Sequence, residues 1–544
     1  MSSRFDSECN MVYQMPEIDF DKAKDNPNSL FTLAFPYMQH HHDRQVPRLQ
    51  VLQQYYIAHN DIKHKAKSKS PNHSNNRIAS AFAQYITNIR VGYFLGNDIQ
   101  FKVDSGQADI DTSIFQDKVD NFNHRNDEVY IDEVIKKDLS ITGRAYDLVY
   151  AEKGTNNLGL TRLDPATCFV IYNDEIKPQP LMAVRYYETG ILNQNIKENY
   201  EIYTADNVFY YHTQGGFINA NIPIVNAVFD NSIPLYFGRV PVDEFANNDE
   251  RTGDWEAELD DIDALDKSVS MMADFQEDFD NANIILTGKF ANMSEPAYMK
   301  DDKGNIIKGK DGNPIVLEPA HPEISPHNHM WYLEPYAMSQ GVGMSKTIIQ
   351  PTAQYLTKQY DFQGWQTYTD FLIGEIHKYT NTPNVSDQNF ASNASGVAMS
   401  YKLWGSDQER KIQEALFQKG LNQRYMCCIN YWKYLNGLPN MANMDTSDIA
   451  GMLNYIFTPN LPKNDQEQST LIQQLNSTGL FSQQTLRELG QSITGVSADT
   501  EDERVNEDEE TENQKQNGYL QNGVGNIFAT GKPIEPQNNE SGNE

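Results

Sequence analysis

Long hydrophobic stripes with helical spacing organise the second half of the chain. Between 252 and 286, large apolar residues recur every three or four positions, which places them on one face of an α-helix; they are Trp255, Leu259, Ile262, Leu265, Val269, Met272, Phe275 and Phe279. A similar stripe predicts a helix over 353–380. This helix should end before Pro383, because the residue that precedes a proline disfavours helix.

A third long helix is expected over 395–435, where the pair Gly405 and Ser406 permits a kink. Two shorter helical patterns follow at 464–475 and 482–490. The remaining chain, 496–544, is polar, and between Glu501 and Glu512 it holds eight acids and one Arg. This composition predicts a disordered acidic tail.

The first 240 residues carry shorter patterns of both kinds. Helices are expected at about 45–69, 77–95, 110–125 and 127–139, and strands at 99–103 and 145–152. From 158 to 243, short alternating runs are separated by Asn, Asp and Gly, which is typical of antiparallel sheet; the runs are 168–172, 181–188, 200–204 and 207–213. Together these patterns predict one α+β domain.

Two segments lack a long pattern. Residues 1–45 are polar and mixed and include His40, His41 and His42, and we interpret them as a flexible N-terminal arm, not as a metal site. The segment 287–350 is rich in turn residues. Within it, 301–319 predicts a hairpin built around Lys303 with Gly304 and Asp311 with Gly312.

Charge changes this picture. The chain has 544 residues, 39% of them hydrophobic, with 75 acidic against 44 basic residues and a net charge of −31. That mass suffices for three to four domains. Because phosphate binding relies on clustered Lys and Arg, nucleic acid is not held by a global positive charge. The acids gather on the polar side of the helix expected at 252–286, at Asp254, Glu256, Glu258, Asp260, Asp261, Asp263, Asp266, Asp274, Glu277, Asp278 and Asp280.

Cysteine usage and hydropathy bear on the compartment. The four cysteines, Cys9, Cys168, Cys427 and Cys428, form no disulfide framework and no CxxC pair, which favours a reducing compartment. The N-terminus lacks an apolar signal core, and no run of eighteen apolar residues occurs. We therefore expect neither secretion by a standard signal nor an integral membrane protein.

Catalytic signatures are absent from the sequence. The nearest approach to a P-loop, from Gly525 to Lys532, has one intervening residue too many and Pro533 in place of Ser or Thr. The run HPEISPHNH offers His321, Glu323, His327 and His329 as possible zinc ligands, but its two prolines and its spacing favour a polar loop. We predict no catalytic residue, cofactor or metal, and a structural or assembly role.

Three stretches carry a family resemblance. They are NRIASAFAQYITNIRVGYFLGNDIQF (76–101), VPVDEFANNDERTGDWE (240–256) and TPNVSDQNFASNASGVAMSYKLWG (382–405). In this order they resemble the portal proteins of tailed double-stranded-DNA bacteriophages of the siphophage type, over about residues 46–490. The third stretch is the most specific, and it departs from the family pattern at Asn384, Gln388, Ala391 and Ser392.

The resemblance implies an α+β portal fold in a ring oligomer, usually a dodecamer. It divides the chain into a wing (46–250), a first stem helix (251–286), a clip (287–350), a second stem helix (351–381), a tunnel loop (382–394), a long kinked helix (395–436), a return to the wing (437–459) and crown helices (460–495). In the tunnel loop, the resemblance implies transient contact between DNA and Asn384, Ser386, Asp387, Gln388, Asn389, Phe390 and Asn393.

The resemblance also implies partners and a place. Double-stranded DNA would pass through the ring without sequence specificity, driven by a separate terminase large subunit that docks on the clip. A head–tail adaptor would follow the terminase, and the major capsid and scaffolding proteins would surround the ring. The expected location is the portal vertex of the virion, after assembly in the host cytoplasm, with no membrane partner.

The acidic helix face has two interpretations. Asp260, Asp263, Asp266 and Glu277 would form a channel wall that repels a polyanion, or they would only solvate the outside of the helix. Two other functions stay open at this point. One is a soluble metal-dependent enzyme that uses the histidines of the 321–329 run, and the other is a different virion head–tail protein, such as a minor head protein or adaptor.

Overall fold

The computed structural model describes residues 4–66, 74–104, 111–191, 194–214, 227–280, 283–290, 295–321, 333–338, 347–356, 360–385, 396–460, 465–498 and 500–508. They belong to two compact units, Met1–Asn384 with Trp404–Pro459, and Val385–Leu403 with Asn460–Glu544. The fold mixes helices and sheets, as the sequence predicts.

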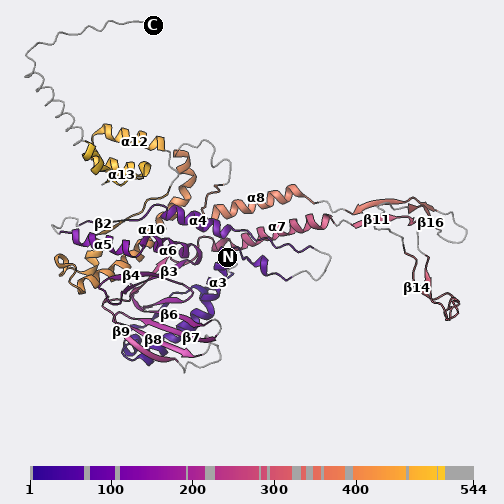
Figure 1. Cartoon of the computed structure of the whole chain (residues 1–544), viewed down its shortest axis with the longest axis horizontal. Helices are drawn as coiled ribbons and strands as arrows, with labels where there is room; N and C mark the ends of the chain where they lie inside the picture. Colours follow the sequence, from indigo (N-terminus) through magenta and orange to yellow (C-terminus); the bar gives the residue numbers. More distant parts are fainter. Residues whose placement is uncertain are drawn as a thin grey trace, which may run out of the picture. The chain divides into compact units, whose positions relative to one another are not determined.

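A six-stranded sheet forms one side of the first unit (Figure 1). Its order is β1-β5-β6-β7-β8-β9, and every pair except the parallel β1 and β5 is antiparallel. The strands are β1 (Tyr13–Met15), β5 (Cys168–Asn173), β6 (Pro180–Ile191), β7 (Gln194–Tyr203), β8 (Asn207–Gln214) and β9 (Val228–Pro234). The antiparallel sheet expected from the alternating runs is therefore present.

The N-terminal segment is part of this sheet, which corrects the flexible arm expected at 1–45. Besides β1, it forms α1 (Glu17–Ala23) and α2 (Pro27–His40). Phe31 of α2 packs edge-on against Tyr200 of β7 at 5.3 Å between ring centroids. His41 is fully buried, with Nδ1 2.5 Å from the Tyr186 hydroxyl, and burial lowers the pKa of His41 to about 3. His41 is thus part of the core packing, while His40 and His42 on either side of it are half-buried.

A second core joins helices to a three-stranded sheet. The sheet order is β10 (Val242–Ala246), β3 (Arg144–Ala151) and β4 (Leu158–Leu163), and a short pair links β2 (Gln100–Val103) to β19 (Leu453–Ile456). The helices are α3 (Val46–Tyr56), α4 (Phe82–Leu95), α5 (Ser113–Arg125), α6 (Glu128–Thr142), α10 (Gly396–Tyr434) and α11 (Thr446–Gly451). Phe115, Phe245, Phe417 and Trp432 lie in its apolar centre, so the end of α10 is buried in the α+β domain.

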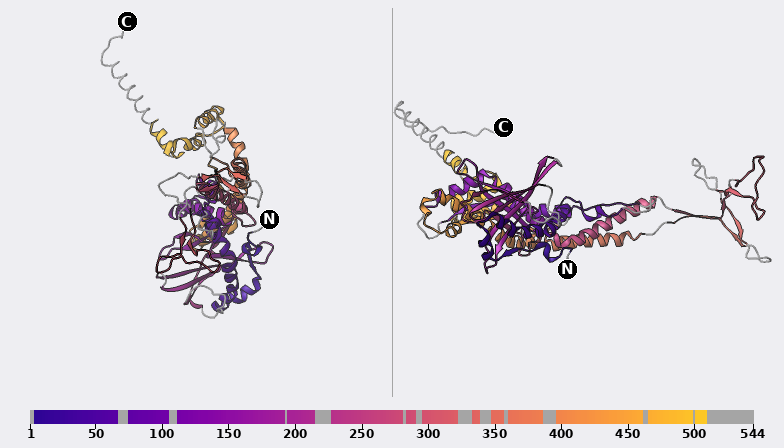
Figure 2. Two further views of the ribbon diagram at one scale, coloured as in Figure 1. Left: turned by 90° about the vertical axis from the view of Figure 1, so that its right-hand side faces the viewer. Right: turned by 90° about the horizontal axis from the view of Figure 1, so that it is seen from below.

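The two helices expected as stem helices, called the stem below, lie side by side in both Figure 1 and Figure 2: α7 (Leu259–Asp280) and α8 (Phe362–Tyr379). Leu372 and Ile376 of α8 pack in one apolar cluster with Ile262 and Leu265 of α7. Both helices are shorter than expected. Residues 283–287 form β11 (Asn283–Thr287), which pairs with β18 (Thr352–Leu356), so the helical predictions for 283–286 and 353–356 are corrected.

The segment between β11 and β18 contains short antiparallel pairs: β12 (Lys289–Phe290) with β15 (Leu333–Glu334), β13 (Ala297–Tyr298) with β14 (Val316–Glu318), and β16 (Tyr336–Met338) with β17 (Thr347–Ile349). The expected turns occur at Gly304 and Gly312, both with positive φ. Three backbone bonds close a triangle there: Met299 donates to Ile315, Ile315 to Ile307 and Ile307 to Met299, at 2.8–3.0 Å. These three residues are spaced eight apart in the sequence, and their backbone bonds form a small three-sided tip in place of the single hairpin that was expected.

The second unit contains α12 (Asp465–Thr478) and α13 (Gln483–Thr494), close to the two helices expected there. Ser482 caps α13 by accepting a hydrogen bond from the backbone of Thr485, and Gly495, with φ of 70°, ends it. Residues 500–508 are helical, and Arg487 of α13 pairs with Asp502. This helix corrects the disorder expected from 496 onward, while 509–544 lie outside the described residues.

Candidate functional site

An extended strap, residues 74–81, runs along the acidic side of α7. Asp266 Oδ1 accepts the backbone N–H of Ser80 at 2.7 Å, Ser270 Oγ accepts that of Ile78 at 2.9 Å, and Asp274 Oδ1 accepts that of Asn76 at 2.6 Å. Side chains four residues apart on a helix are separated by about 6 Å, which is close to the length of two extended residues. The side chains of α7 and alternate strap residues therefore match in register.

Two further hydrogen bonds add to these three, and we call the five together the ladder between the strap and α7. Asn60 Nδ2 donates to Asp266 Oδ2 at 2.5 Å, and the Asn76 side chain donates to Glu277 Oε2 at 2.9 Å. Asp266 is only 1% exposed. Burial raises the pKa of Asp266, although hydrogen bonds from Ser80 and Asn60 oppose the rise. The ladder also explains why α4 begins at Phe82 and not at Arg77. The backbone N–H groups of Asn76, Ile78 and Ser80 donate to side chains of α7, so this segment stays outside the helix.

The four acids predicted to line a channel wall differ in their exposure and in their hydrogen-bond partners. Asp260 and Glu277 are exposed. Asp263 accepts hydrogen bonds from the Tyr55 hydroxyl at 2.6 Å and from Arg4 at 3.2 Å. Asp266 is buried and contributes to no surface of the subunit, which corrects the prediction for this residue. Neither interpretation of the acidic face anticipated that its carboxylates bind other segments of the same chain.

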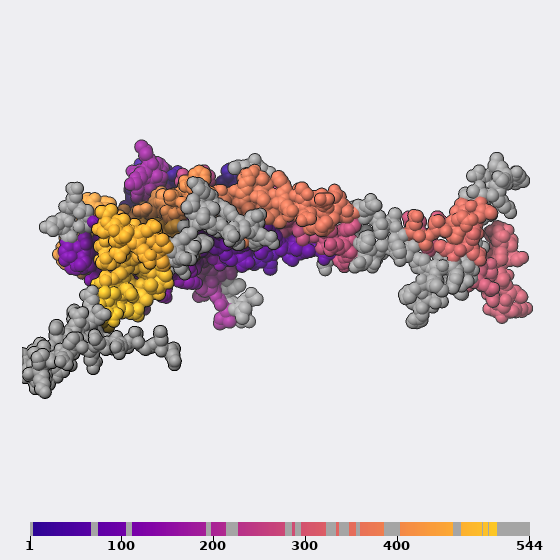
Figure 3. Space-filling model, turned by 90° about the horizontal axis from the view of Figure 1, so that it is seen from above, coloured from indigo at the N-terminus to yellow at the C-terminus, as the bar shows by residue number. Residues whose placement is uncertain are grey.

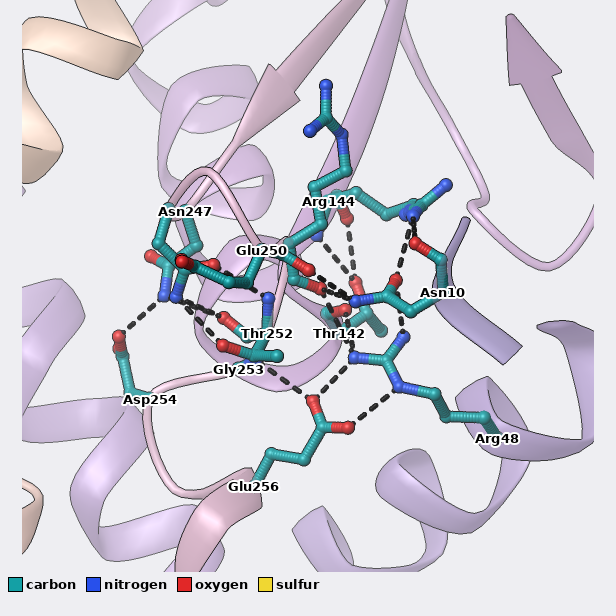
Figure 4. A network of polar contacts seen from close by, with 12 residues as sticks. Asn10, Arg48, Thr142, Arg144, Asn247, Glu250, Thr252, Gly253, Asp254 and Glu256 are labelled. Carbon is teal, nitrogen blue, oxygen red and sulfur yellow. Dashed lines mark hydrogen bonds and ion pairs between the residues drawn. The ribbon is translucent and has the colours of Figure 1, made fainter. Parts of the chain in front are cut away.

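The base of α7 is fixed by a network of charged side chains (Figure 4). Arg48 of α3 makes a two-pronged contact with Glu256, with Nε to Oε1 at 2.7 Å and the second nitrogen to Oε2 at 2.5 Å. Arg144 of β3 donates to Asn10 Oδ1 at 2.7 Å, while the Asn10 amide donates to the backbone of Glu250 at 2.5 Å. The network thus ties the N-terminal segment, α3 and β3 to the loop that leads into the stem.

Backbones approach closely at this point. A Cβ on Gly143, whose φ is +82°, would lie 2.1 Å from the carbonyl oxygen of Arg251. A Cβ on Gly253 would lie 2.5 Å from the carbonyl oxygen of Ile141. Only glycine at both positions allows the end of α6 to contact the loop before α7.

A second network connects α10 to the same loop. Asp254 accepts the Gln413 side-chain amide at 2.9 Å and the Asn247 amide at 2.8 Å. Lys136 of α6 donates to Gln413 Oε1 at 2.8 Å, and Arg90 of α4 contacts Asp254 at 3.6 Å. Burial alone would raise the pKa of Asp254, but the charges of Lys136 and Arg90 hold it at about 2. Burial lowers the pKa of Lys136 to about 8.

Arg424 anchors α10 in the α+β domain. Its guanidinium is fully buried and donates to Asp132 Oδ1 and to Asp147 Oδ2, both at 2.6 Å. Glu128 lies nearby, and burial together with Asp132 raises the pKa of Glu128. Burial also raises the pKa of Asp147, against the effect of Arg424. Sequence reasoning missed this cluster because its members lie on α6, β3 and α10 with no shared motif.

The expected tunnel loop and kink are described only in part. Asn384 lies in the described chain, whereas Ser386, Asp387, Gln388, Asn389, Phe390 and Asn393 lie outside it. Gly405 and Ser406 are inside α10, and the Ser406 hydroxyl donates to the carbonyl of Asn381 at the end of α8. A Cβ on Gly405 would approach Asn381 Oδ1 to 3.2 Å. This pair therefore permits close contact between α10 and α8, and the kink stays a prediction.

The other chemistry considered above finds no assembled site in the described ranges. His321 is exposed, while Glu323, His327 and His329 fall outside the description. Among the described residues, no group of three or more His, Cys, Asp or Glu side chains could hold a metal. Cys427 and Cys428 are fully buried, and burial raises the pKa of both thiols well above its usual value. No described helix is long and apolar enough to span a membrane.

Comparison with known proteins agrees with the resemblance drawn from the sequence. The family model described as "Phage portal protein, SPP1 Gp6-like" matches residues 37–515. The portal protein of Bacillus phage SPP1 is 24% identical over 251 residues, which are 43% of this chain and 47% of that relative. The aligned region therefore spans about half of the relative's length. The match of the family model includes α7, α8, α10, α12 and α13, and it confirms the family predicted from the sequence: this chain belongs to the phage portal protein family.

Proposed function

We propose that this chain assembles into the ring-shaped channel at one capsid vertex through which phage DNA is packaged and ejected. The observation that carries the proposal is the family match over residues 37–515. In this role the protein is a structural component of the virion, and a separate motor supplies the energy. We expect twelve copies in the ring.

The anchored stem suits such a conduit. A channel wall must hold its shape while a stiff polyanion moves past it, and it must not bind phosphates strongly. Arg48 with Glu256, and Asp254 with Gln413, fix the base of α7 to the α+β domain. Removing one partner of a buried ion pair such as Arg48 with Glu256 destabilises a protein strongly, so this pair favours one arrangement of stem and domain.

The loop at 382–394 is the proposed contact with moving DNA. Short polar side chains in this segment favour transient contacts over tight binding. α10 follows the loop, and Gln413 and Arg424 connect α10 to the stem base and to the α+β domain. A displacement of the loop would therefore be transmitted through α10 to the stem base and to the α+β domain.

The segment 287–350 is the proposed docking platform for the terminase large subunit and later for the head–tail adaptor. The described part of this segment exposes apolar side chains near the three-sided tip, among them Ile306, Val316 and Leu317. Exposed apolar groups that gather within one short segment support a role in protein contacts. The major capsid and scaffolding proteins would contact the outside of the ring in the virion and during assembly in the host cytoplasm.

Electron microscopy of the purified full chain tests the assembly. We expect closed rings with a central hole, and class averages that give the number of copies. Light scattering on the same sample should give the mass of about twelve subunits. A stable monomer at micromolar concentration in assembly buffer would contradict the proposed function.

A further inference from the structure

Three buried carboxyl groups face a single guanidinium where α6 meets α10. Glu128, at the start of α6, is 4% exposed, and Asp132 of α6 and Asp147 of β3 are at most 1% exposed. The Arg424 guanidinium of α10 is fully buried between them. If all four groups were ionised, three negative charges would share one positive charge. An uncompensated buried charge is so costly that a carboxyl group takes up a proton instead.

The contacts of Arg424 select Glu128 as the group that holds this proton. Arg424 donates to Asp132 and to Asp147, both at 2.6 Å, whereas its contact with Glu128 is 3.9 Å long and therefore no hydrogen bond. Asp132 and Asp147 are thus stabilised as carboxylates. Glu128 has no such partner and is left as the group for which ionisation costs most.

Glu128 and Asp132 are in direct contact with each other. They lie four residues apart on α6, so their side chains are neighbours on one face of the helix. Among the described residues, no N–H or hydroxyl group donates to Glu128 Oε1 or to Asp132 Oδ2. The two side chains are hydrogen-bonded to each other, and two carboxyl groups form such a bond only when one of them carries a proton. One shared proton therefore supplies the donor that this pair needs.

The charges around Glu128 act in the same direction. Burial is the largest cause that raises the pKa of Glu128, followed by the charge of Asp132 and the hydrogen bond to it. The charge of Asp98, between α4 and β2, adds to the rise, and only Arg424 opposes it among these named causes. The surroundings therefore favour the protonated form of Glu128.

The other titratable groups packed around the pair are neutral or already paired. Tyr425 and Cys428 of α10 and Tyr455 of β19 are buried, and burial raises the pKa of each, so all three stay uncharged at neutral pH. Asp243 of β10 faces Arg239 at 3.7 Å. On the side toward solvent, the groups near Glu128 are His124, Asp127 and Glu133.

An open cavity leads from the surface to Glu128. It has a volume of 460 Å³ and lies at the turn from α5 to α6, where Tyr130 and Glu133 line it together with Glu128. Tyr130 and Glu133 are exposed, and the purple atoms of the α5 region reach the surface at the left of the space-filling view (Figure 3). The proton therefore has a path to water that does not require unfolding.

We infer that one proton, held between Glu128 and Asp132, joins the start of α6 to α10, and that this joint opens when the proton leaves. Without the proton, Glu128 and Asp132 repel each other one turn apart and compete for the same guanidinium. Because α10 follows the loop at 382–394, the attachment of this helix to the α+β domain then depends on pH. The inference concerns the fold of one subunit and goes beyond the proposed function.

The direction of the pH dependence follows from the raised pKa of Glu128. In the unfolded chain this group releases its proton near the ordinary pKa of 4.5, whereas the folded chain keeps the proton at higher pH. The stabilisation by the joint is therefore complete below pH 4.5 and is lost as the pH rises through the raised pKa of the folded chain. Between these values, one proton makes the opening equilibrium about tenfold more favourable per pH unit.

Infrared difference spectra of the full-length chain at pH 7 test where the proton lies. Glu128→Gln is uncharged and nearly isosteric with the protonated acid, and its amide can donate to Asp132. We expect the difference between the unmodified chain and this variant to contain the C=O band of a protonated carboxyl group. The matched control is Glu133→Gln, which lines the same cavity but is exposed, and its difference should contain carboxylate bands. A carboxylate signal from Glu128 would overturn the inference.

Amide exchange measures the opening of the joint. The rates at the start of α6 and around Arg424 are compared between the unmodified chain and Glu128→Gln at each pH from 6 to 9, which cancels the intrinsic effect of pH on exchange. The ratio of the two rates should increase with pH, by up to about tenfold per unit. Glu133→Gln should exchange like the unmodified chain throughout. A ratio that is independent of pH, or an equal change in the control, would show that no proton at Glu128 holds α6 to α10.

Discussion

Asp266 and Ser80 are 186 residues apart in sequence, and the carboxylate of Asp266 accepts the backbone N–H of Ser80 at 2.7 Å. This bond is the first step of the ladder that holds the strap on α7. It turns an acid that the helical pattern places on a solvent-facing side into a partner for a distant backbone. The acidic composition of α7 therefore contributes to the fold of the subunit as well as to its charge.

Removing the Asp266 acceptor should loosen the strap. Asp266→Ala leaves the Ser80 N–H and the Asn60 amide without this partner, and an unsatisfied buried group costs about 1–3 kcal/mol. Amide exchange at Ser80, Ile78 and Asn76 should become faster than in the unmodified chain. The exposed Asp174→Ala serves as a control and should leave this exchange unchanged. Unaltered protection in Asp266→Ala would show that the ladder does not hold the strap.

Acid should weaken the link between the stem base and α10. The pKa of Asp254 is about 2 in the folded chain, against an ordinary value of 3.8, so folding favours the carboxylate. Its contribution, about 2 kcal/mol, is complete above pH 4 and is lost as the pH falls toward 2. Denaturant unfolding at pH 5 and pH 3 should show a larger loss for the unmodified chain than for Asp254→Asn. Equal losses would place the acid sensitivity elsewhere.

Removal of the Arg424 charge should destabilise the α+β domain strongly. Arg424→Met leaves Asp132 and Asp147 buried without their guanidinium, and breaking a buried pair in this way costs about 3–5 kcal/mol. The matched control is Arg487→Met, which removes the partner of exposed Asp502 and should cost at most about 1 kcal/mol. Urea unfolding of both variants checks the difference. Similar midpoints for the two would contradict the anchoring role of Arg424.

Shortening the segment 386–394 should separate assembly from DNA movement. A deletion of 388–392 should leave rings intact in micrographs, because it removes none of the residues that fix the stem to the α+β domain, such as Arg48, Glu256 and Gln413. Packaging in an in vitro assay should decrease if the loop contacts DNA. A deletion of the same length in the acidic tail, 520–524, controls for general effects. Normal packaging with the loop deletion would make this segment only a connection between helices.

A cation near the outer end of α7 should make the channel retain DNA. Glu277→Lys reverses an exposed charge on every subunit. Duplex binding by assembled rings should then increase and decline steeply with salt, since each neutralised phosphate adds about 0.9 to the slope of log affinity against log salt. Glu175→Lys, on an exposed loop of the α+β domain, is the control. Equal weak binding by both variants would place Glu277 away from the channel.

Helical periodicity alone located both ends of α10, α12 and α13 to within four residues, because burial of an apolar stripe depends on local spacing, whereas each end of α7 was placed six or seven residues too far out. Periodicity failed to predict the structure where pairing with a distant strand competes with helix formation. Residues 352–356 have an apolar pattern compatible with helix, but pairing with β11 satisfies their backbone groups as a strand. The N-terminal pattern around Phe31 was overlooked because its polar surroundings resemble a flexible arm, and only contact with the sheet revealed its core role.

Sequence by itself determined the family, the stem helices and the charge of this protein. The tertiary structure decided what the charges do. Whether Asp254, Asp266 or Arg424 is solvated or buried depends on hydrogen-bond partners that lie 159 to 292 residues away, from Gln413 for Asp254 to Asp132 for Arg424. A carboxylate has the same local preference in either case, and only the fold brings a backbone N–H or a guanidinium to it. The chemistry of α7 was therefore fixed by segments that its own pattern does not contain.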